Sequence, residues 1–220
     1  MSHPFRLPTA GALISSRVAH FAAGSRVYLQ GEEPLKIYIV EQGLVTLTRC
    51  SSGGDRRVLA ICASGSTLGF SSALILTAHP ASADAVTETM IRVFDAHDVV
   101  HQCSVEPSFG SWISVMLARE SANQLAYTAS LALGARQRLM RLFAIVVASG
   151  CGSRADDGVL HVPTGLTHRD IAEAIWTTRE TATRLLVRLA ADGIVQFDRG
   201  LIIVSVTSPL HLLVASQNPV

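Results

Sequence analysis

The sequence is poor in lysine and in net charge. Lys36 is the only lysine among 18 basic residues, and the formal net charge is +1. Attraction of the whole molecule to nucleic acid is therefore weak, and any contact with DNA must come from local placement of charge. Arginine, unlike lysine, offers a planar fork that can recognise guanine or phosphate through two hydrogen bonds.

The cysteines are few and unpaired in sequence. Cys50, Cys62, Cys103 and Cys151 lie far apart and form no C-x-x-C pair. This spacing argues against a zinc ribbon and against an iron–sulfur cluster. We interpret the four residues as buried or idle thiols.

Long apolar runs are also absent. No stretch of eighteen apolar residues occurs, and the N-terminus lacks a basic-then-apolar secretory pattern, so we expect neither membrane insertion nor export. The expected location is the cytoplasm. With 220 residues, 49% of them hydrophobic, the chain can bury a core, and two small domains fit its length best.

Short β-branched or aromatic runs separated by glycines fill the region from about Gly24 to Phe94. The runs are Val27–Leu29, Ile37–Val40, Leu44–Leu47, Val58–Ile61 and Val86–Val93. Such runs predict strands, and the intervening glycines permit tight turns. We expect a small antiparallel roll or barrel here.

Helical spacing then replaces the strand pattern. Asp95 can cap a short helix, and no glycine or proline interrupts the segment from Ser111 to Leu133. A helix of that length, ~30 Å at 1.5 Å per residue, is longer than a lone domain needs. A second copy of the same helix in a parallel two-fold pair would cover its apolar stripe, although a core helix of a monomer stays open.

Gly134 ends this pattern and begins another helix. Its expected exposed side carries Arg136, Arg138 and Arg141, opposite Leu139, Leu142, Phe143 and Val146. The glycine-rich segment 150–158 predicts a loop, and 159–162 could form one short strand.

Two short capped helices follow in succession. Thr167 with Asp170 predicts the first cap, and Thr177 with Glu180 predicts the second. Behind them, 193–197 and 201–206 are β-forming runs across Asp198-Arg199-Gly200, which predicts a hairpin. The combination predicts a winged helix-turn-helix.

The second of these helices has one face free for DNA. Arg179, Glu180, Thr183 and Arg184 share the side opposite its leucines. Arginine matches the two acceptors of guanine, and glutamate can accept from the amino group of cytosine. The alternative is that Glu180 only caps the helix and pairs with Arg184 in solvent.

These motifs resemble the cyclic-AMP receptor/fumarate-nitrate regulator (CRP/FNR) superfamily. T-T-R-E-T-A-T-R-L-L-V-R-L at Thr177–Leu189, followed by D-G-I-V, resembles its recognition helix. G-E-E-P, E-Q-G-L-V and S-G-S-T-L-G resemble its β-roll turns and the approach to its effector pocket. The likeness extends over almost the whole chain.

The resemblance implies an α+β fold in three parts. An N-terminal antiparallel β-roll like that of cyclic-nucleotide-binding domains would span residues 1–104, a dimerisation helix and hinge 105–134, and a C-terminal winged helix-turn-helix 135–220. The implied function is that of a dimeric, sequence-specific transcriptional regulator that binds an inverted-repeat site in double-stranded DNA. Contact with RNA polymerase would come partly from the loop around Gly152–Asp157.

Site residues follow by position in the family motif. Arg179, Glu180 and Arg184 would contact bases, and the expected contacts to the DNA backbone are Thr167, His168, Thr178 and Thr183. The expected effector pocket comprises Gly69, Phe70, Ser71, Ser82, Asn123 and Gln124, the last two facing the effector across the dimer or joining the two helices.

Two departures from the family pattern matter. Cyclic-AMP-binding members have a glutamate after the second glycine and an arginine before a serine, where this sequence has Phe70 and Ala81-Ser82. A buried cyclic phosphate would lack its charge partner, so we expect that cyclic AMP is not the effector. Trp176 stands where the family usually has glycine, at a position that tends to need a left-handed backbone.

Three alternatives remain beside this interpretation. A haem- or redox-based sensor of the same family could use His79, His97, His101 or Cys103, but no pair has a diagnostic spacing. An enzyme is disfavoured because His168-Arg169-Asp170 lacks the downstream asparagine of a kinase and no phosphate-binding glycine loop with lysine exists. A DNA-free interaction protein derived from such a regulator is the third. The effector's identity stays unknown.

Overall fold

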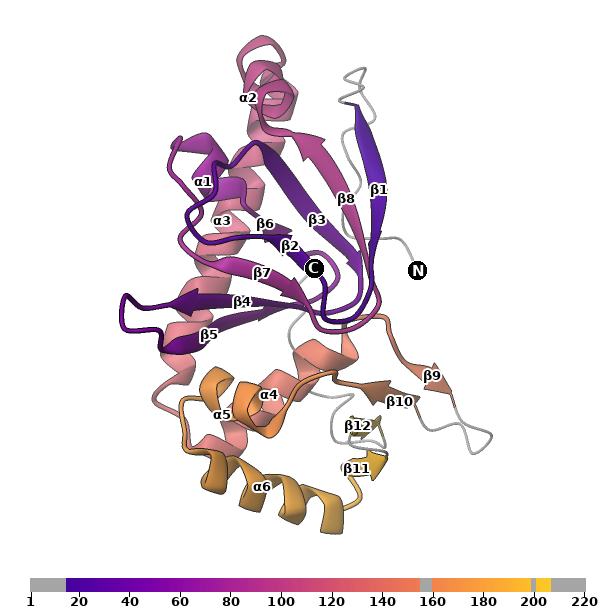
Figure 1. Cartoon of the computed structure of the whole chain (residues 1–220). Coiled ribbons are helices and arrows are strands. Elements are labelled where there is room, and N and C mark those ends of the chain that lie inside the picture. The colour runs from indigo at the N-terminus through magenta and orange to yellow at the C-terminus, as the bar shows by residue number, and fades with distance from the viewer. Residues whose placement is uncertain (1–14, 155–159, 199–200, 207–220) are drawn as a thin grey trace.

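The computed structural model describes residues 15–154, 160–198 and 201–206. Figure 1 shows a β-roll at the top, one long helix running along its side, and a smaller helical domain with a short sheet below. No helix in these ranges is long and apolar enough to cross a membrane.

Two four-stranded antiparallel sheets form the roll. One contains, in order, β1 (Ser16–Phe21), β8 (Thr89–Asp95), β3 (Lys36–Gln42) and β6 (Thr67–Leu68). The other contains β2 (Arg26–Tyr28), β7 (Ser82–Ala85), β4 (Val45–Cys50) and β5 (Arg56–Cys62). Alternate residues of the strands point inward, and the interior consists of Tyr28, Val40, Val45, Leu68, Ala83, Ile91 and Val93.

Three helices pack on the roll. They are α1 (Phe70–Leu74), α2 (Ala96–Val105) and α3 (Pro107–Ser130). Asp95 caps α2 by accepting a hydrogen bond from the His97 N–H at 3.0 Å, as the sequence predicted. On α3, Phe109, Ile113 and Met116 are buried against the roll.

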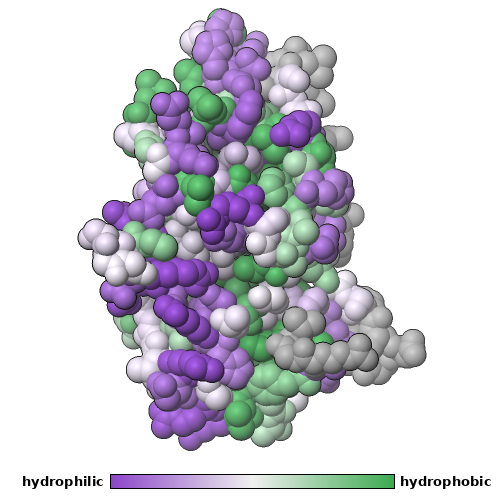
Figure 2. Space-filling model, viewed as in Figure 1, coloured by the Kyte–Doolittle hydropathy of each residue, from purple (hydrophilic) through white to green (hydrophobic). Residues whose placement is uncertain are grey.

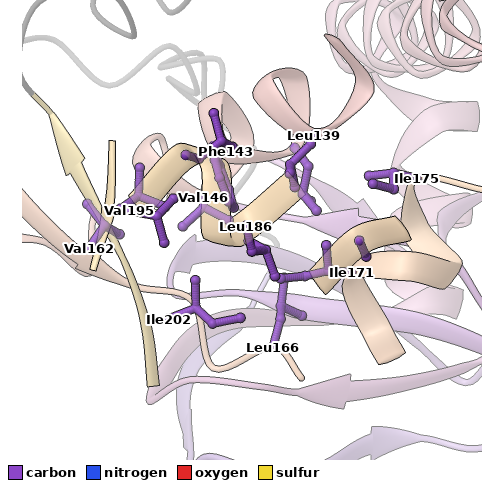
Figure 3. Packing of buried hydrophobic residues seen from close by; sticks show 14 of the residues in the cluster. Leu139, Phe143, Val146, Val162, Leu166, Ile171, Ile175, Leu186, Val195 and Ile202 are labelled. Carbon is purple, nitrogen blue, oxygen red and sulfur yellow. The ribbon is translucent and has the colours of Figure 1, made fainter. Parts of the chain in front are cut away.

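The C-terminal domain is a winged helix-turn-helix. Its helices are α4 (Ala135–Val147), α5 (His168–Ala174) and α6 (Arg179–Ala191). Its sheet has the order β11 (Val195–Asp198), β12 (Leu201–Val206), β10 (Leu160–Pro163), β9 (Ser153–Arg154). Figure 3 shows side chains from α4, α5, α6 and the sheet meeting in one core.

The two domains share an extensive contact. Leu44 and Ala63 of the roll belong to the same hydrophobic cluster as the C-terminal core. Gly165, with φ +63°, lies so close to the roll that an added Cβ would stand 2.1 Å from the Val86 carbonyl oxygen, so only glycine fits there.

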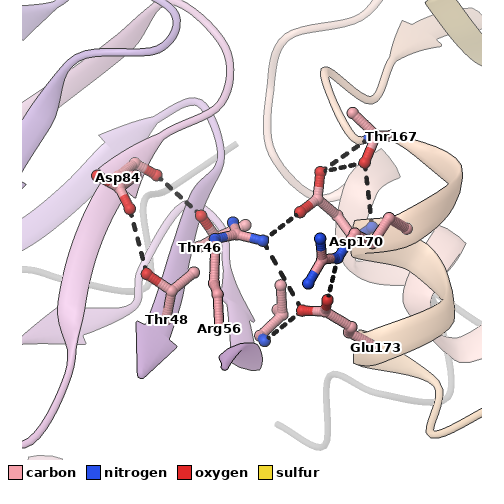
Figure 4. A network of polar contacts seen from close by, with 9 residues as sticks. Thr46, Thr48, Arg56, Asp84, Thr167, Asp170 and Glu173 are labelled. Carbon is pink, nitrogen blue, oxygen red and sulfur yellow. Dashed lines mark hydrogen bonds and ion pairs between the residues drawn. The ribbon is translucent and has the colours of Figure 1, made fainter. Parts of the chain in front are cut away.

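A polar cluster strengthens this contact (Figure 4). The Arg56 guanidinium of β5 lies 2.8 Å from Asp170 and 3.7 Å from Glu173, both on α5. The Val58 backbone N–H also donates to Glu173 at 2.9 Å. These contacts fasten the first helix of the helix-turn-helix to the roll.

The predicted fold class and the order of its parts are confirmed, with local corrections. The run 86–93 is not one strand: residues 86–88 form the bend between β7 and β8, and β8 begins only at Thr89. Strand β1 was not predicted. Arg138 was expected on the exposed side of α4, but its guanidinium is half-buried and bonded to backbone carbonyls.

Candidate nucleic-acid interface and sensor site

The first helix of the motif is capped as predicted. The Thr167 hydroxyl accepts a hydrogen bond from the Asp170 N–H at 3.1 Å, and the Asp170 carboxylate accepts from the Thr167 N–H at 3.0 Å. This reciprocal capping box satisfies two N–H groups that the helix itself cannot pair. Thr167 remains exposed at the start of α5.

The turn between the two helices contains a tryptophan whose backbone has the left-handed conformation. Trp176 has φ +52°, the backbone conformation expected from the glycine that usually stands there. A non-glycine residue in this region costs about 1–3 kcal/mol and persists only where surrounding contacts hold it.

The second helix begins one residue later than predicted. Thr178, not Thr177, is its N-cap, because the Thr178 hydroxyl accepts from the Thr181 N–H at 3.2 Å. Glu180 therefore lies in the first turn but is not the third-position partner of a capping box. Its own backbone N–H and then the Thr178 hydroxyl lower the pKa of its carboxyl, so the side chain is an ionised acceptor at neutral pH.

One face of α6 is buried and the opposite face is free. Ala182, Leu186 and Leu189 are completely buried in the domain core, whereas Arg179, Glu180 and Arg184 are exposed. Arg184 donates to the Thr181 hydroxyl at 3.2 Å. Hydrophilic residues predominate over α5 and α6 on the lower left of the surface in Figure 2.

The four residues expected at the DNA backbone occupy two kinds of position. Thr167 and Thr178 are exposed at the N-termini of α5 and α6, where backbone N–H groups favour anions. His168 and Thr183 are half-buried, and the His168 Nδ1 lies 3.0 Å from the Thr183 hydroxyl. This contact braces α5 against α6.

At the expected sensor site, three of the predicted residues lie at the start of α1 and Ser82 lies on β7. Gly69 is the left-handed N-cap of this helix, with φ 72°, and Phe70 is 4% exposed among the apolar residues beneath α3. The Ser71 hydroxyl donates to Glu120 at 3.4 Å, and the Ser82 hydroxyl accepts from the Gln30 N–H at 2.9 Å.

The imidazole of His79 lies against the backbone of Gly69, a contact that sequence reasoning did not anticipate. His79 is 3% exposed and stacks on Tyr28 with 3.9 Å between ring centroids. A Cβ on Gly69 would lie 2.8 Å from the imidazole, so glycine is required for this approach. Burial lowers the pKa of His79, which keeps the ring neutral, and its Nδ1 has no hydrogen-bond partner among the residues that the structure describes.

The residues considered for haem do not converge. His97 and His101 are exposed on α2, whereas His79 is buried within the roll. In the part of the chain that the structure describes, no group of three His, Cys, Asp or Glu side chains could hold a metal ion.

Glu120 is the polar residue that α3 turns toward the roll. It accepts from Ser71 with one carboxylate oxygen, while the other is buried and has no partner within the described ranges. Asn123 and Gln124, which we expected near the effector, are both exposed in the single chain. The sequence offered no signal for Glu120 beyond its place on the helix.

Substituting Glu120 with glutamine tests the cost of this carboxylate. Burial raises the pKa of Glu120, so its ionised form destabilises the fold, and stability falls as pH rises from the usual pKa through the raised one. We expect Glu120→Gln to raise the melting temperature at neutral pH and to match the wild type in acid. Thermal unfolding across pH measures this, with the exposed Glu88→Gln as control; an equal shift at every pH would contradict it.

Comparisons with known proteins agree with this geometry. Residues 18–104 match the family model of the cyclic nucleotide-binding domain, and residues 137–208 match that of the Crp-like helix-turn-helix domain. The transcriptional regulator LdrP of Thermus thermophilus is 27% identical over 176 residues, which cover 80% of this chain and 85% of LdrP. The global nitrogen regulator of Synechococcus elongatus is 27% identical, with 77% of each chain covered.

A solved structure confirms the likeness in fold. The structure of FixK2 from Bradyrhizobium japonicum superposes with a TM-score of 0.71 at 21% identity, covering 90% of this chain and 97% of that one. The roll, the long helix and the winged domain therefore occur together in a known arrangement.

Proposed function

Because the chain belongs to the CRP/FNR superfamily of DNA-binding transcriptional regulators, we propose that it acts as a homodimer that inserts α6 into the major groove of an inverted-repeat site. It regulates transcription without catalysing a reaction. Its base contacts come from Arg179, Glu180 and Arg184.

The observation that carries this proposal is the exposed side of α6. Three side chains able to read base edges project from a helix whose leucines anchor it in the core. The guanidinium of arginine fits the O6 and N7 acceptors of guanine, and an ionised glutamate accepts from the N4 amino group of cytosine. A half-site rich in G·C pairs is the expected target.

Phosphate contacts would position the helix. Thr167 and Thr178 stand at two helix N-termini and would place their hydroxyl and backbone N–H groups against the DNA backbone. His168 and Thr183 are the other two proposed contacts to the DNA backbone. Their contact with each other would hold α5 and α6 together beside that DNA strand.

A second copy of the chain is the proposed partner of α3. Exposed residues recur at alternating intervals of four and three along this helix: Ser111, Val115, Ala118, Ala122, Leu125 and Ala129. That spacing is a coiled-coil seam, and its small residues allow close approach. Leu125 is 71% exposed and Val115 is 49% exposed in the single chain, so pairing would remove both from water.

Cyclic AMP is not the proposed effector. Phe70 and Ala81 are buried where the resemblance would require a glutamate and an arginine, and the carboxylate that α3 adds is Glu120. An anionic phosphate would meet the Glu120 carboxylate, and Ala81 stands in place of the arginine that would pair with it. Calorimetric titration with cyclic AMP should give no saturable heat, and DNA affinity should not change; saturable binding would refute this.

The remaining parts of the proposal rest on the family. RNA polymerase is the proposed second partner, through the loop around 152–157, of which residues 155–157 lie outside the described ranges. The domain limits at 104 and 134 stay a prediction, and the site of action is the cytoplasm, where the target DNA lies.

Selection from random duplexes tests the function directly. The purified protein is mixed with a duplex library, and the bound fraction is sequenced over several rounds. We expect an inverted repeat with G-containing half-sites whose centres lie about one helical turn apart. Failure to enrich any sequence at low salt would instead favour a DNA-free interaction protein.

A further inference from the structure

The turn of the helix-turn-helix is tied to the long helix. The Trp176 indole N–H donates to the Tyr127 hydroxyl at 2.5 Å, and that hydroxyl donates to the Ala174 carbonyl at 3.4 Å. Tyr127 lies in the last turn of α3. A phenol on the dimerisation helix therefore contacts both ends of the turn that precedes α6.

Arg138 of α4 supports the same turn from a third direction. Its Nε donates to the Ile175 carbonyl at 2.8 Å and its Nη2 to the Trp176 carbonyl at 3.4 Å. Its Nη1 donates to the Leu131 and Leu133 carbonyls that connect α3 to α4. One side chain thus joins the end of α3 to the helix-turn-helix.

The backbone strain at Trp176 points to a purpose for its side chain. Glycine would adopt φ +52° at little cost, whereas tryptophan is strained there. The indole is 54% exposed, so apolar burial does not account for it well. Glycine has no side chain, so it could not supply the indole N–H that donates to Tyr127.

The direction of α6 follows from this turn, since the helix begins at Arg179, three residues after Trp176. We propose that Tyr127 and Trp176 form a positioning joint through which α3 sets the orientation of the recognition helix. In a dimer paired along α3, this orientation fixes the distance between the two α6 helices and so the spacing of the half-sites. The inference rests on the proposed function.

The Tyr127–Trp176 joint also lies close to the sensor site along α3. Tyr127 follows Glu120 by seven residues, two helical turns along one face of α3, or about 10.5 Å at 1.5 Å per residue. Glu120 contacts Ser71 of the roll, and Tyr127 contacts the turn. A shift of α3 at the roll would reach α6 through this hydroxyl.

The test uses the full chain and duplexes in which the selected half-sites are separated by spacers of varied length. The wild type should prefer one spacer. Tyr127→Phe, which loses only the hydroxyl, should lower affinity for that spacer by up to about tenfold and flatten the preference. The base preference within a half-site should stay unchanged, because the face of α6 is intact.

Tryptophan fluorescence follows the joint without DNA. Trp112→Phe leaves Trp176 as the only tryptophan, since the chain contains 2. In this background, Tyr127→Phe should increase quenching of Trp176 by acrylamide. Tyr38→Phe, which removes the hydroxyl of a half-buried tyrosine in the roll, is the matched control and should change neither the quenching nor the spacer profile.

A second variant keeps the proposal falsifiable if Tyr127→Phe folds poorly. Trp176→Gly suits the left-handed backbone and should flatten the spacer profile without lowering the melting temperature. An unchanged spacer profile in both variants would overturn the joint. Failure of the proposed function would look different, since the wild type itself would then bind no duplex.

Discussion

Alanine at Arg179 is expected to weaken binding to the selected inverted repeat by about 1–3 kcal/mol for each half-site, because one two-pronged contact to guanine is lost in each. The preference at one base pair per half-site should relax, while the preference at the other positions is kept. Competition binding with duplexes that carry each single-base replacement, at one fixed salt concentration, measures both effects.

The same helix offers a matched control. Arg188 is exposed in the last turn of α6, so Arg188→Ala removes an equal charge far from the N-terminal half that would enter the groove. We expect a small loss of affinity that is the same for every sequence. If Arg179→Ala behaved in this uniform way too, Arg179 would contact phosphate and its assignment as a base contact would be wrong.

The winged helix-turn-helix could be predicted from the sequence because the patterns that indicate it are local. The Thr167 cap with Asp170, the leucine spacing of α6 and the turn residues between β11 and β12 each lie within one short window. A cap is ambiguous by one residue when two threonines adjoin, which is why Thr177 was predicted and Thr178 found. Only the three-dimensional direction of the hydroxyl distinguishes them.

The contacts between elements could not be predicted in this way. Arg138 looked like an exposed arginine because the Ile175 carbonyl that its Nε binds lies 37 residues away along the chain. The bend at 86–88 was not predicted because the partly buried Val86 packs against the core of the C-terminal domain, so in the sequence it looks like a strand residue. Residues that are buried by a distant segment carry the same local pattern as residues buried in a strand.

The sensor site could be predicted in part. Its lost arginine and glutamate were evident from the sequence, because they are absent from a recognisable motif. The residues near their positions, His79 against Gly69 and Glu120 against Ser71, were not evident, since each depends on a contact between elements. Absence of a ligand group is therefore readable from sequence, whereas the chemistry that takes its place needs coordinates.

A charge in the seam of α3 is expected to have the largest effect on DNA binding. Leu125→Glu would place a carboxylate at the more exposed of the two large apolar side chains in the seam, Val115 and Leu125, where its desolvation opposes pairing. The variant should sediment as a monomer. Its affinity for the inverted repeat should fall by roughly 10²–10⁴-fold, because the second half-site is no longer held at high effective concentration.

Two comparisons make this result specific to pairing. Ser114→Glu adds the same charge to an exposed position of α3 outside the seam and should leave the dimer and its affinity intact. Binding to a duplex with a single half-site should be nearly equal in wild type and Leu125→Glu, because a single helix-turn-helix is sufficient for one half-site. A Leu125→Glu protein that still sedimented as a dimer would place the interface elsewhere, and the spacing of the half-sites would then have to be set by a surface other than α3.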